Sequence, residues 1–167
     1  MNGYNDYISI TRRWMKEYNT FRATVESMTA DIQEQQKLLS RSENLCAPIA
    51  NYDGMSKGGS PGLNGVEAKA YDRLRREASI HRQTLNRDEI KRIIDTIDRA
   101  LNTLSLEDQA VLTEHYIDGR SWEQIGYCRN YSERWAREKG GKALKSLAFV
   151  IFGVKARPEQ LTFVFAC

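Results

Sequence analysis

Apolar residues recur at steps of three and four along the N-terminal stretch from about Tyr4 to Leu45. This is the spacing of one face of an amphipathic α-helix, and no proline or glycine interrupts the stretch. The spacing is also close to a heptad repeat, which favours a coiled-coil contact within the chain or with a second copy. The expected stripe consists of Tyr7, Ile10, Trp14, Tyr18, Phe21, Val25, Met28, Ile32 and Leu39, with Gln35 in its one polar slot.

A second long helical pattern runs from Gly65 to Thr103, and residues 46–65 separate it from the first. That connector holds two prolines and five glycines, so we expect a flexible loop. Two helices of about 40 residues would each be about 60 Å long, and residues 1–104 are therefore expected to form an antiparallel hairpin used for oligomerisation. The second stripe is thin in its first half (Val66, Ala70, Leu74, Ala78, Leu85) and richer in its second (Ile90, Ile93, Ile94, Ile97, Leu101, Leu104).

Three serines, Ser105, Ser121 and Ser132, mark candidate helix starts in the C-terminal third. The first two are followed three positions later by an acid or an amide, which is the spacing of a capping box. The third is followed at once by a glutamate, which suits the positive end of a helix dipole. Asp118-Gly119 ends the first segment, and only about four residues can be non-helical between the second and third. This order predicts a helix-turn-helix whose last helix enters the DNA major groove.

The complete pattern predicts an all-α fold with a hairpin at 1–104, a three-helix head at 105–152 and an apolar tail at 153–167. The tail either covers the core of the head as a short strand or docked segment, or forms an interface to another protein. Residues 149–152 are expected to extend the last helix up to Gly153. The expected inward residues of the head are Leu106, Ala110, Val111, Tyr116, Ile117, Trp122, Ile125, Ala136, Ala143, Leu144 and Leu147.

Charge is uneven along the chain. From Arg129 to Arg157 eight basic residues stand against two acidic ones, a net charge of +6, whereas the whole chain carries +3 and the remainder therefore −3. A solvated helix face would also carry charge, but the basic excess coincides with the capped third helix. This coincidence favours a phosphate-binding surface, with double-stranded DNA as the partner.

The third helix carries the residues expected to read DNA. The N-terminal residues of a recognition helix reach base edges, so Arg134 is the leading candidate for a bidentate guanine contact. Glu133 or Glu138 would accept from a cytosine amino group or orient an arginine. Phosphate contacts are expected from Ser132, Arg137, Lys142 and Lys145, and Trp135 belongs to the set with an orientation that the pattern leaves open.

Two segments of the head resemble a known family. The run from His115 to Ile125 (HYIDGRSWEQI) and the closing run from Lys142 to Leu147 (KALKSL) resemble the C-terminal helix-turn-helix of bacterial sigma factors. Trp-Glu-Gln-Ile and the segment from Asn130 to Arg134 look more specifically like the ArpU/RinA-type phage transcriptional regulators. The resemblance covers less than half of the chain. It implies a DNA-binding activator of phage late, packaging or lysis genes, and it raises the host RNA polymerase as a second partner.

The third helix departs from the pattern of similar proteins. Ala136 replaces a β-branched residue, Lys139 occupies an expected apolar position, and Gly140-Gly141 follows in mid-helix. Each glycine costs roughly 1 kcal/mol relative to alanine. Either the small residues allow close helix packing, or the helix is soft and orders on DNA.

No catalytic, metal or cofactor site is expected. His115 and Glu114 are adjacent on a helix and so point about 100° apart, which is unsuitable for an acid–base pair. His81 has no ligand partner at the next helical turn, and the glycine-rich connector lacks phosphate-loop spacing. Three cysteines without a Cys-x-x-Cys pair, and the absence of a long apolar run, predict a non-membrane, cytosolic protein. The resemblance to phage regulators implies that this cytoplasm is that of a bacterial host, where a DNA-binding protein would be associated with the nucleoid.

Three functions remain open at this point. The leading hypothesis is a non-enzymatic, sequence-specific transcription regulator that dimerises through its hairpin. A phage small terminase subunit also joins a helix-turn-helix to an oligomerisation region, but it would bind packaging-site DNA as a ring. An adaptor that binds polymerase through a sigma-like head would show no salt-dependent DNA binding.

Overall fold

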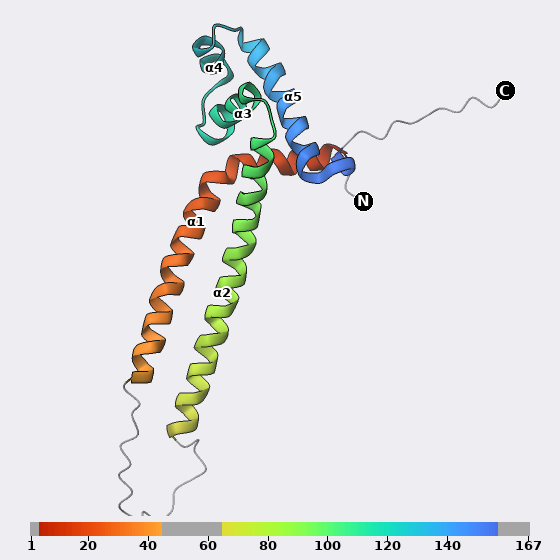
Figure 1. The fold of residues 1–167 in the computed structure, drawn as a ribbon. Helices are drawn as coiled ribbons and strands as arrows, with labels where there is room; N and C mark the ends of the chain where they lie inside the picture. The colour runs from red at the N-terminus through yellow and green to blue at the C-terminus, as the bar shows by residue number, and fades with distance from the viewer. Residues whose placement is uncertain (1–3, 45–64, 157–167) are drawn as a thin grey trace, which may run out of the picture. The chain divides into compact units, whose positions relative to one another are not determined.

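The computed structural model describes residues 4–44 and 65–156, and over these residues the expected all-α fold is confirmed, with no strand among them (Figure 1). Two long helices come first and three shorter ones follow; a π turn lies between the first two of the shorter helices, and a 3₁₀ turn follows the last. The elements are α1 (Tyr4–Asn44), α2 (Gly65–Asn102), α3 (Leu106–Leu112), a π turn (Thr113–Ile117), α4 (Trp122–Cys128), α5 (Glu133–Phe152) and a 3₁₀ turn (Gly153–Ala156).

The chain divides into two compact units. The hairpin unit spans residues 24–90, of which 24–44 and 65–90 are described. The head unit combines residues 1–23 with 91–167, of which 4–23 and 91–156 are described. The predicted loop at 46–65, apart from Gly65 itself, and the predicted extended tail beyond Ala156 lie outside the described residues.

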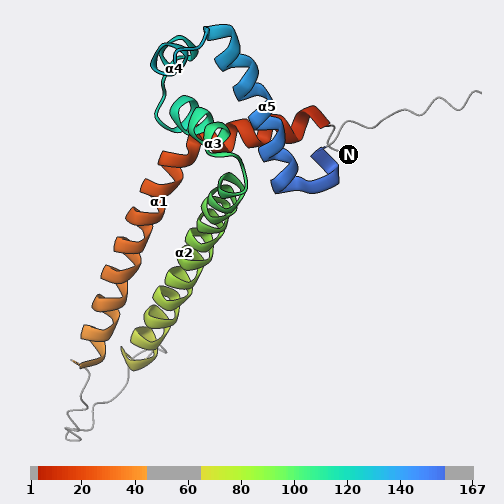
Figure 2. The ribbon, with the colours of Figure 1, turned by 45° about the horizontal axis from the view of Figure 1, so that its top comes forward.

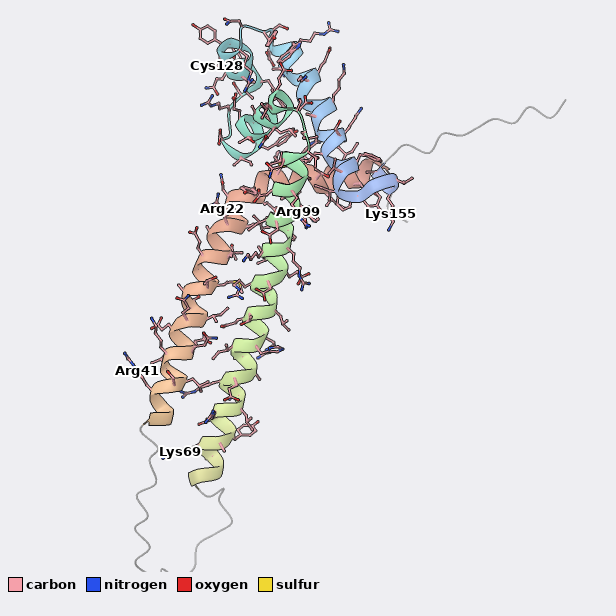
Figure 3. The ribbon with its side chains drawn as sticks, in the orientation of Figure 1. Arg22, Arg41, Lys69, Arg99, Cys128 and Lys155 are labelled. Atoms are coloured by element: carbon pink, nitrogen blue, oxygen red, sulfur yellow. The ribbon has the colours of Figure 1, made fainter. Side chains whose placement is uncertain are left out.

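In the hairpin unit, the end of α1 and the start of α2 run antiparallel and side by side in both views (Figures 1 and 2). The α1 stripe behaves as predicted here, since Ile32 is buried and its neighbours on the stripe are half-buried. Arg41 lies near the end of α1 and Lys69 near the start of α2 (Figure 3). Both side chains are exposed, as expected for charged residues outside the contact between the helices.

The predicted stripe in the first half of α2 is wrong for its described side chains. Leu74 and Leu85 are 64% and 56% exposed, and Ala70 and Ala78 are also exposed. The buried residue of this half is Ile80, which lies off that stripe. Ile80 lines a cavity together with Gln35 and Leu38 of α1, so α2 presents the face of Ile80 to α1. The richer second half is correct, with Ile94, Ile97 and Leu101 buried and Ile90, Ile93 and Leu104 half-buried.

In the head unit, α3, α4 and α5 pack around a small apolar core. Val111, Leu112 and Ile125 are fully buried, and the expected inward residues of α5 (Ala136, Ala143, Leu144 and Leu147) are all buried. Leu106 contradicts the prediction, because it is 85% exposed. It begins α3 and lies well over 100° around the helix from both Val111 and Leu112, which define the inward face.

The first turns of α1 also belong to the head unit, with a contact face slightly rotated from the predicted stripe. Ile8, Thr11 and Met15 are buried, whereas the predicted Tyr7, Ile10 and Trp14 are only half-buried. The buried Thr11 hydroxyl donates to the Tyr7 carbonyl at 2.8 Å, so its burial leaves no unpaired hydroxyl. The Tyr7 and Trp14 rings contact Phe152 at the end of α5, with ring centroids 5.0 and 5.5 Å apart.

Two longer-range hydrogen bonds tie α1 to the rest of the head unit. The Tyr18 hydroxyl donates to Asp98 Oδ1 of α2 at 2.7 Å, and burial together with this bond raises the pKa of Tyr18. Asn19 Nδ2 donates to the Ile117 carbonyl at 2.9 Å. At the other end of the head, Gly153 has φ +64°, a left-handed conformation that ends α5 where the sequence predicts.

Candidate nucleic-acid interface

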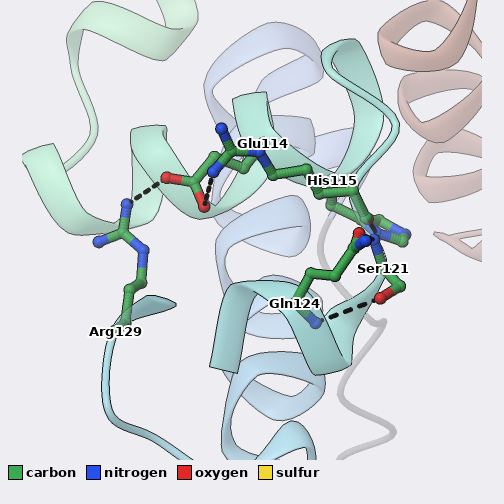
Figure 4. Close-up of polar contacts among 6 residues, drawn as sticks. Glu114, His115, Ser121, Gln124 and Arg129 are labelled. Carbon is green, nitrogen blue, oxygen red and sulfur yellow. Dashed lines mark hydrogen bonds and ion pairs between the residues drawn. The ribbon is translucent and has the colours of Figure 1, made fainter. Parts of the chain in front are cut away.

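The three predicted serines all cap helices. Ser121 and Gln124 form a reciprocal capping box, in which the Ser121 hydroxyl accepts from the Gln124 amide and the Gln124 side chain accepts from the Ser121 amide (Figure 4). Ser132 accepts from the Trp135 amide at 3.2 Å. Ser105 differs, because its hydroxyl accepts from the Asp108 amide but also donates to the Asp108 carboxylate. These caps fix the starts of α3, α4 and α5.

The turn between α4 and α5 is tight, and it occupies residues 129–132 as predicted. Asn130 adopts φ +56°, the left-handed region that asparagine tolerates, and the Tyr131 amide donates to the Gly126 carbonyl at 2.8 Å. A Cβ on Gly126 would lie 2.8 Å from the Tyr131 carbonyl oxygen, so this position requires glycine. The angle between α4 and α5 is therefore set by backbone contact.

Gly140 gives α5 room for the indole of Trp122. The ring lies directly over this glycine, and a Cβ there would overlap it. Gly141 is different, since a Cβ at that position would meet no atom within 4 Å. Because α5 continues without a break from Glu133 to Phe152, close packing accounts for Gly140.

Lys139 connects α5 to the first turn of α3. Its ammonium lies 2.7 Å from Glu107 Oε2 and 3.2 Å from Asp108 Oδ1. The hydrogen bonds to these two carboxylates raise the pKa of Lys139. At this position, where an apolar contact was expected, the chain makes an electrostatic one.

A second ion pair joins the π turn to the start of the turn between α4 and α5. Arg129 Nη2 lies 2.7 Å from Glu114 Oε1, and Arg120 Nη1 lies 3.8 Å from Glu114 Oε2 (Figure 4). Less than a third of either the Glu114 or the Arg129 side chain is exposed. Sequence reasoning counted Arg129 in the basic surface and missed this pairing, because nothing local signals a partner across two turns.

His115 packs flat on Trp122, with ring centroids 3.5 Å apart, and its Nδ1 lies 2.8 Å from the Arg120 carbonyl oxygen. Because a carbonyl only accepts, Nδ1 carries a proton. Burial lowers the pKa of His115; the bond to the Arg120 carbonyl opposes this, and the charge of Lys16 adds to the lowering. His115 and Glu114 thus have separate environments and partners.

The charged residues predicted to contact DNA share one exposed face of α5. Glu133, Arg134, Arg137, Glu138, Lys142 and Lys145 are all exposed. The other two predicted site residues have structural roles as well: Ser132 caps the helix, and Trp135 is half-buried and stacks on Tyr131 with centroids 3.8 Å apart. The structure therefore brings six of the eight residues together on one accessible surface.

Two ion pairs run along this face. Arg134 Nε lies 2.9 Å from Glu138 Oε1, and Arg137 pairs with Glu133 in the same way. The hydrogen bond and charge of Arg134 hold the pKa of Glu138 below its ordinary value. Lys142 and Lys145 make no ion pair in the part of the chain that the structure describes. Both arginines thus have their charges balanced within α5, while the two lysines present theirs to solvent.

No group of histidine, cysteine and carboxylate side chains within 4–44 and 65–156 could hold a metal ion. None of the helices in those ranges is long and apolar enough to cross a membrane. Cys128, at the end of α4, is exposed (Figure 3).

Comparison with known proteins adds no family to this description. No family model matches the chain, and no curated protein or solved structure matches it.

Proposed function

We propose that the chain is a sequence-specific DNA-binding transcription regulator of the ArpU/RinA type, with α5 as its recognition helix. The observation that carries the proposal is the pair α4–α5: two serine-capped helices, a four-residue turn closed on Gly126, and a charged, exposed face on the second helix. A helix-turn-helix inserts its second helix into the major groove, which is wide enough for one α-helix.

Within this proposal, Arg134 reads bases. It is the second residue of α5 and its side chain is 88% exposed, so it lies at the end of the helix that approaches base edges. Its guanidinium can bind guanine O6 and N7 together. Glu138 holds it in place before DNA arrives, and the arginine exchanges that carboxylate for the base.

Lys142 and Lys145 lie farther along α5, where they would contact phosphates. Such contacts set position and affinity but carry little sequence information. The resemblance of the head to sigma factors and to ArpU/RinA-type phage regulators extends the proposal to activation of phage late, packaging or lysis genes in a bacterial host, with RNA polymerase as a second protein partner.

The test is selection of bound fragments from phage genomic DNA by the full chain, followed by affinity measurements on the selected site. We expect Arg134→Ala to weaken binding to that site roughly ten- to hundredfold and to relax its specificity. Lys145→Ala should weaken binding to selected and unrelated DNA by similar factors. No salt-dependent binding to any fragment would reject the proposal and favour the polymerase adaptor.

Oligomeric state separates this proposal from the small terminase alternative. A regulator of this type is expected to be a dimer in light scattering, whereas an octamer or larger ring would favour a terminase subunit. A surface suited to a dimer lies on α2, where Tyr71, Leu74, Ala78 and Leu85 form an exposed stripe at steps of three, four and seven residues.

A further inference from the structure

The head unit contains a cleft between the N-terminal part of α1 and the flank of α5. Its volume is about 360 Å³. Four cationic side chains line it, Arg12 and Lys16 from α1 and Arg137 and Lys145 from α5, and no acidic side chain lies among the described residues of its lining. Cations from two distant segments of the chain therefore converge on one concave surface.

Helical geometry explains the convergence. Arg12 and Lys16 are one turn apart on the same side of α1, and Arg137 and Lys145 are two turns apart on α5. Between the two α5 cations, Gly141 contributes no side chain, and a Cβ there would meet nothing within 4 Å. The α5 wall of the cleft is thus open to close approach by a ligand between two positive charges.

This arrangement is unfavourable without an anion. Arg137 is paired with Glu133 within α5, but the charges of Arg12, Lys16 and Lys145 repel one another at a concave surface that has apolar neighbours such as Ile8 and Leu144. The positive charge of Lys16 also acts on His115, another lining residue, because it contributes to lowering the pKa of His115. A polyanion with regularly spaced charges would neutralise both walls together.

We infer that this cleft holds the DNA phosphodiester backbone beside the major groove, and that Arg12 and Lys16 are phosphate-contacting residues. The inference rests on the proposed function. An α-helix with its side chains is about 10–12 Å across, close to the width of the major groove, so the bordering backbones lie against its flanks. Arg137 lies both on the exposed face of α5 and in the cleft. It therefore connects the surface proposed to read bases with the cleft proposed to hold the DNA backbone.

The experiment measures the salt dependence of DNA affinity for the full chain by fluorescence anisotropy. The test variant is Arg12→Gln with Lys16→Gln, which removes two charges while keeping long polar side chains. The matched control is Arg13→Gln with Lys91→Gln, two exposed cations of the head unit outside the cleft lining. Circular dichroism and thermal unfolding establish that both variants are folded.

We expect the test variant to lose about 1.8 from the magnitude of the slope of log K against log salt, and the control to stay close to wild type. Near 0.1 M salt this corresponds to roughly ten- to hundredfold weaker binding on selected and unrelated DNA. Ethylation of individual phosphates should also reveal a site at which modification weakens the wild type but not the test variant.

Equal slopes for the test variant and the control would overturn the cleft assignment while leaving DNA binding intact. A wild-type chain that binds no DNA would instead reject the proposed function itself. The two failures are therefore distinguishable in one series of titrations.

Discussion

Gly140 and Gly141 are neighbours in sequence but have opposite surroundings. The first lies under the Trp122 ring, and the second has no atom near the position that a Cβ would take. Trp122 also stacks on His115 and meets Tyr116 edge-on, so its ring cannot move without disturbing both. One glycine is therefore required by packing, whereas the other only lowers the helix propensity of α5.

This contrast gives a matched pair of substitutions. Gly140→Ala should destabilise the head by about 1–3 kcal/mol, because its methyl group overlaps the indole. Gly141→Ala should stabilise it by up to about 1 kcal/mol, because alanine fits the open position and favours the helix. Urea denaturation measures both values, and equal effects of the two substitutions would contradict the packing of Trp122 on Gly140.

His115 makes the stability of the head depend on pH. Its pKa in the folded chain is lowered, mainly by burial, so the unfolded chain binds more protons as pH falls through the ordinary histidine range. The contribution of neutral His115 to the free energy of unfolding is fully present above pH about 6.5, and it is lost as the pH falls through the pKa of His115 in the folded chain.

We therefore expect the Tm of the wild-type chain to fall between pH 7 and pH 5.5 more than that of His115→Phe, which keeps an aromatic ring against Trp122. His81→Gln removes the only other histidine, which is exposed, and should leave the wild-type pH dependence unchanged. Differential scanning calorimetry supplies the measurement. A pH dependence that survives in His115→Phe would assign it to other groups.

At the scale of elements, two sets of ion pairs link segments of the head beyond what the turn between α4 and α5 connects. Lys139 connects α5 to the start of α3, and Arg129 connects the turn after α4 to Glu114 of the π turn. The pair of Arg129 with Glu114 is the more buried of the two, and both Glu114 Oε2 and Arg129 Nε are buried without a hydrogen-bond partner. Removing one partner would leave a partly desolvated charge on the other.

Glu114→Gln is accordingly expected to lower the free energy of unfolding by about 1–3 kcal/mol. The control is Glu133→Gln, whose exposed pair with Arg137 lies within α5 and should contribute less than about 1 kcal/mol. A double-mutant cycle with Arg129→Gln isolates the coupling between positions 114 and 129. If the cycle closes with no coupling energy, the pair has no role in positioning the turn.

The elements that the sequence predicts well are those with local causes. The serine caps and the four-residue turn depend on neighbours within a few positions, and the apolar periodicity of α5 identifies all four of its predicted buried residues. Contacts between segments far apart carry no such signal. The fit of Trp122 to Gly140 and the pairing of Glu114 with Arg129 required the packed head, although a glycine at an expected helix interior was a visible clue to the first.

Weak stripes explain the errors in the long helices. In the first half of α2 the predicted stripe rests partly on alanines, and the face that is buried is that of Ile80. At the start of α1, the rows through Tyr7 and Trp14 and through Ile8 and Met15 are adjacent, and only the position of the head decides which is buried. Periodicity predicts that such helices exist more reliably than it predicts which side faces a partner.

At the scale of the whole molecule, the misassigned α2 stripe becomes informative because it is exposed. Tyr71 and Leu74 are 68% and 64% exposed, and Leu85 is 56% exposed, at positions a and d of a heptad repeat. In a parallel pair of α2 helices, Glu77 at position g would face Arg82 of the second copy at position e. An antiparallel pair would instead bring arginines at e positions together, so charge favours the parallel arrangement.

A dimer formed through this stripe should be sensitive to loss of its leucines. We expect Leu74→Ser with Leu85→Ser to shift the full chain from dimer to monomer in light scattering at micromolar concentration, because the two residues supply most of the stripe's aliphatic surface. Leu38→Ser is the control, since Leu38 is 51% exposed in the same unit but belongs to α1.

A Glu77→Arg variant should weaken the dimer by setting two cations opposite each other, and Glu77→Arg with Arg82→Glu should restore it. Restoration would support the parallel pairing, whereas a dimer unaffected by all of these changes would place the interface elsewhere on the chain.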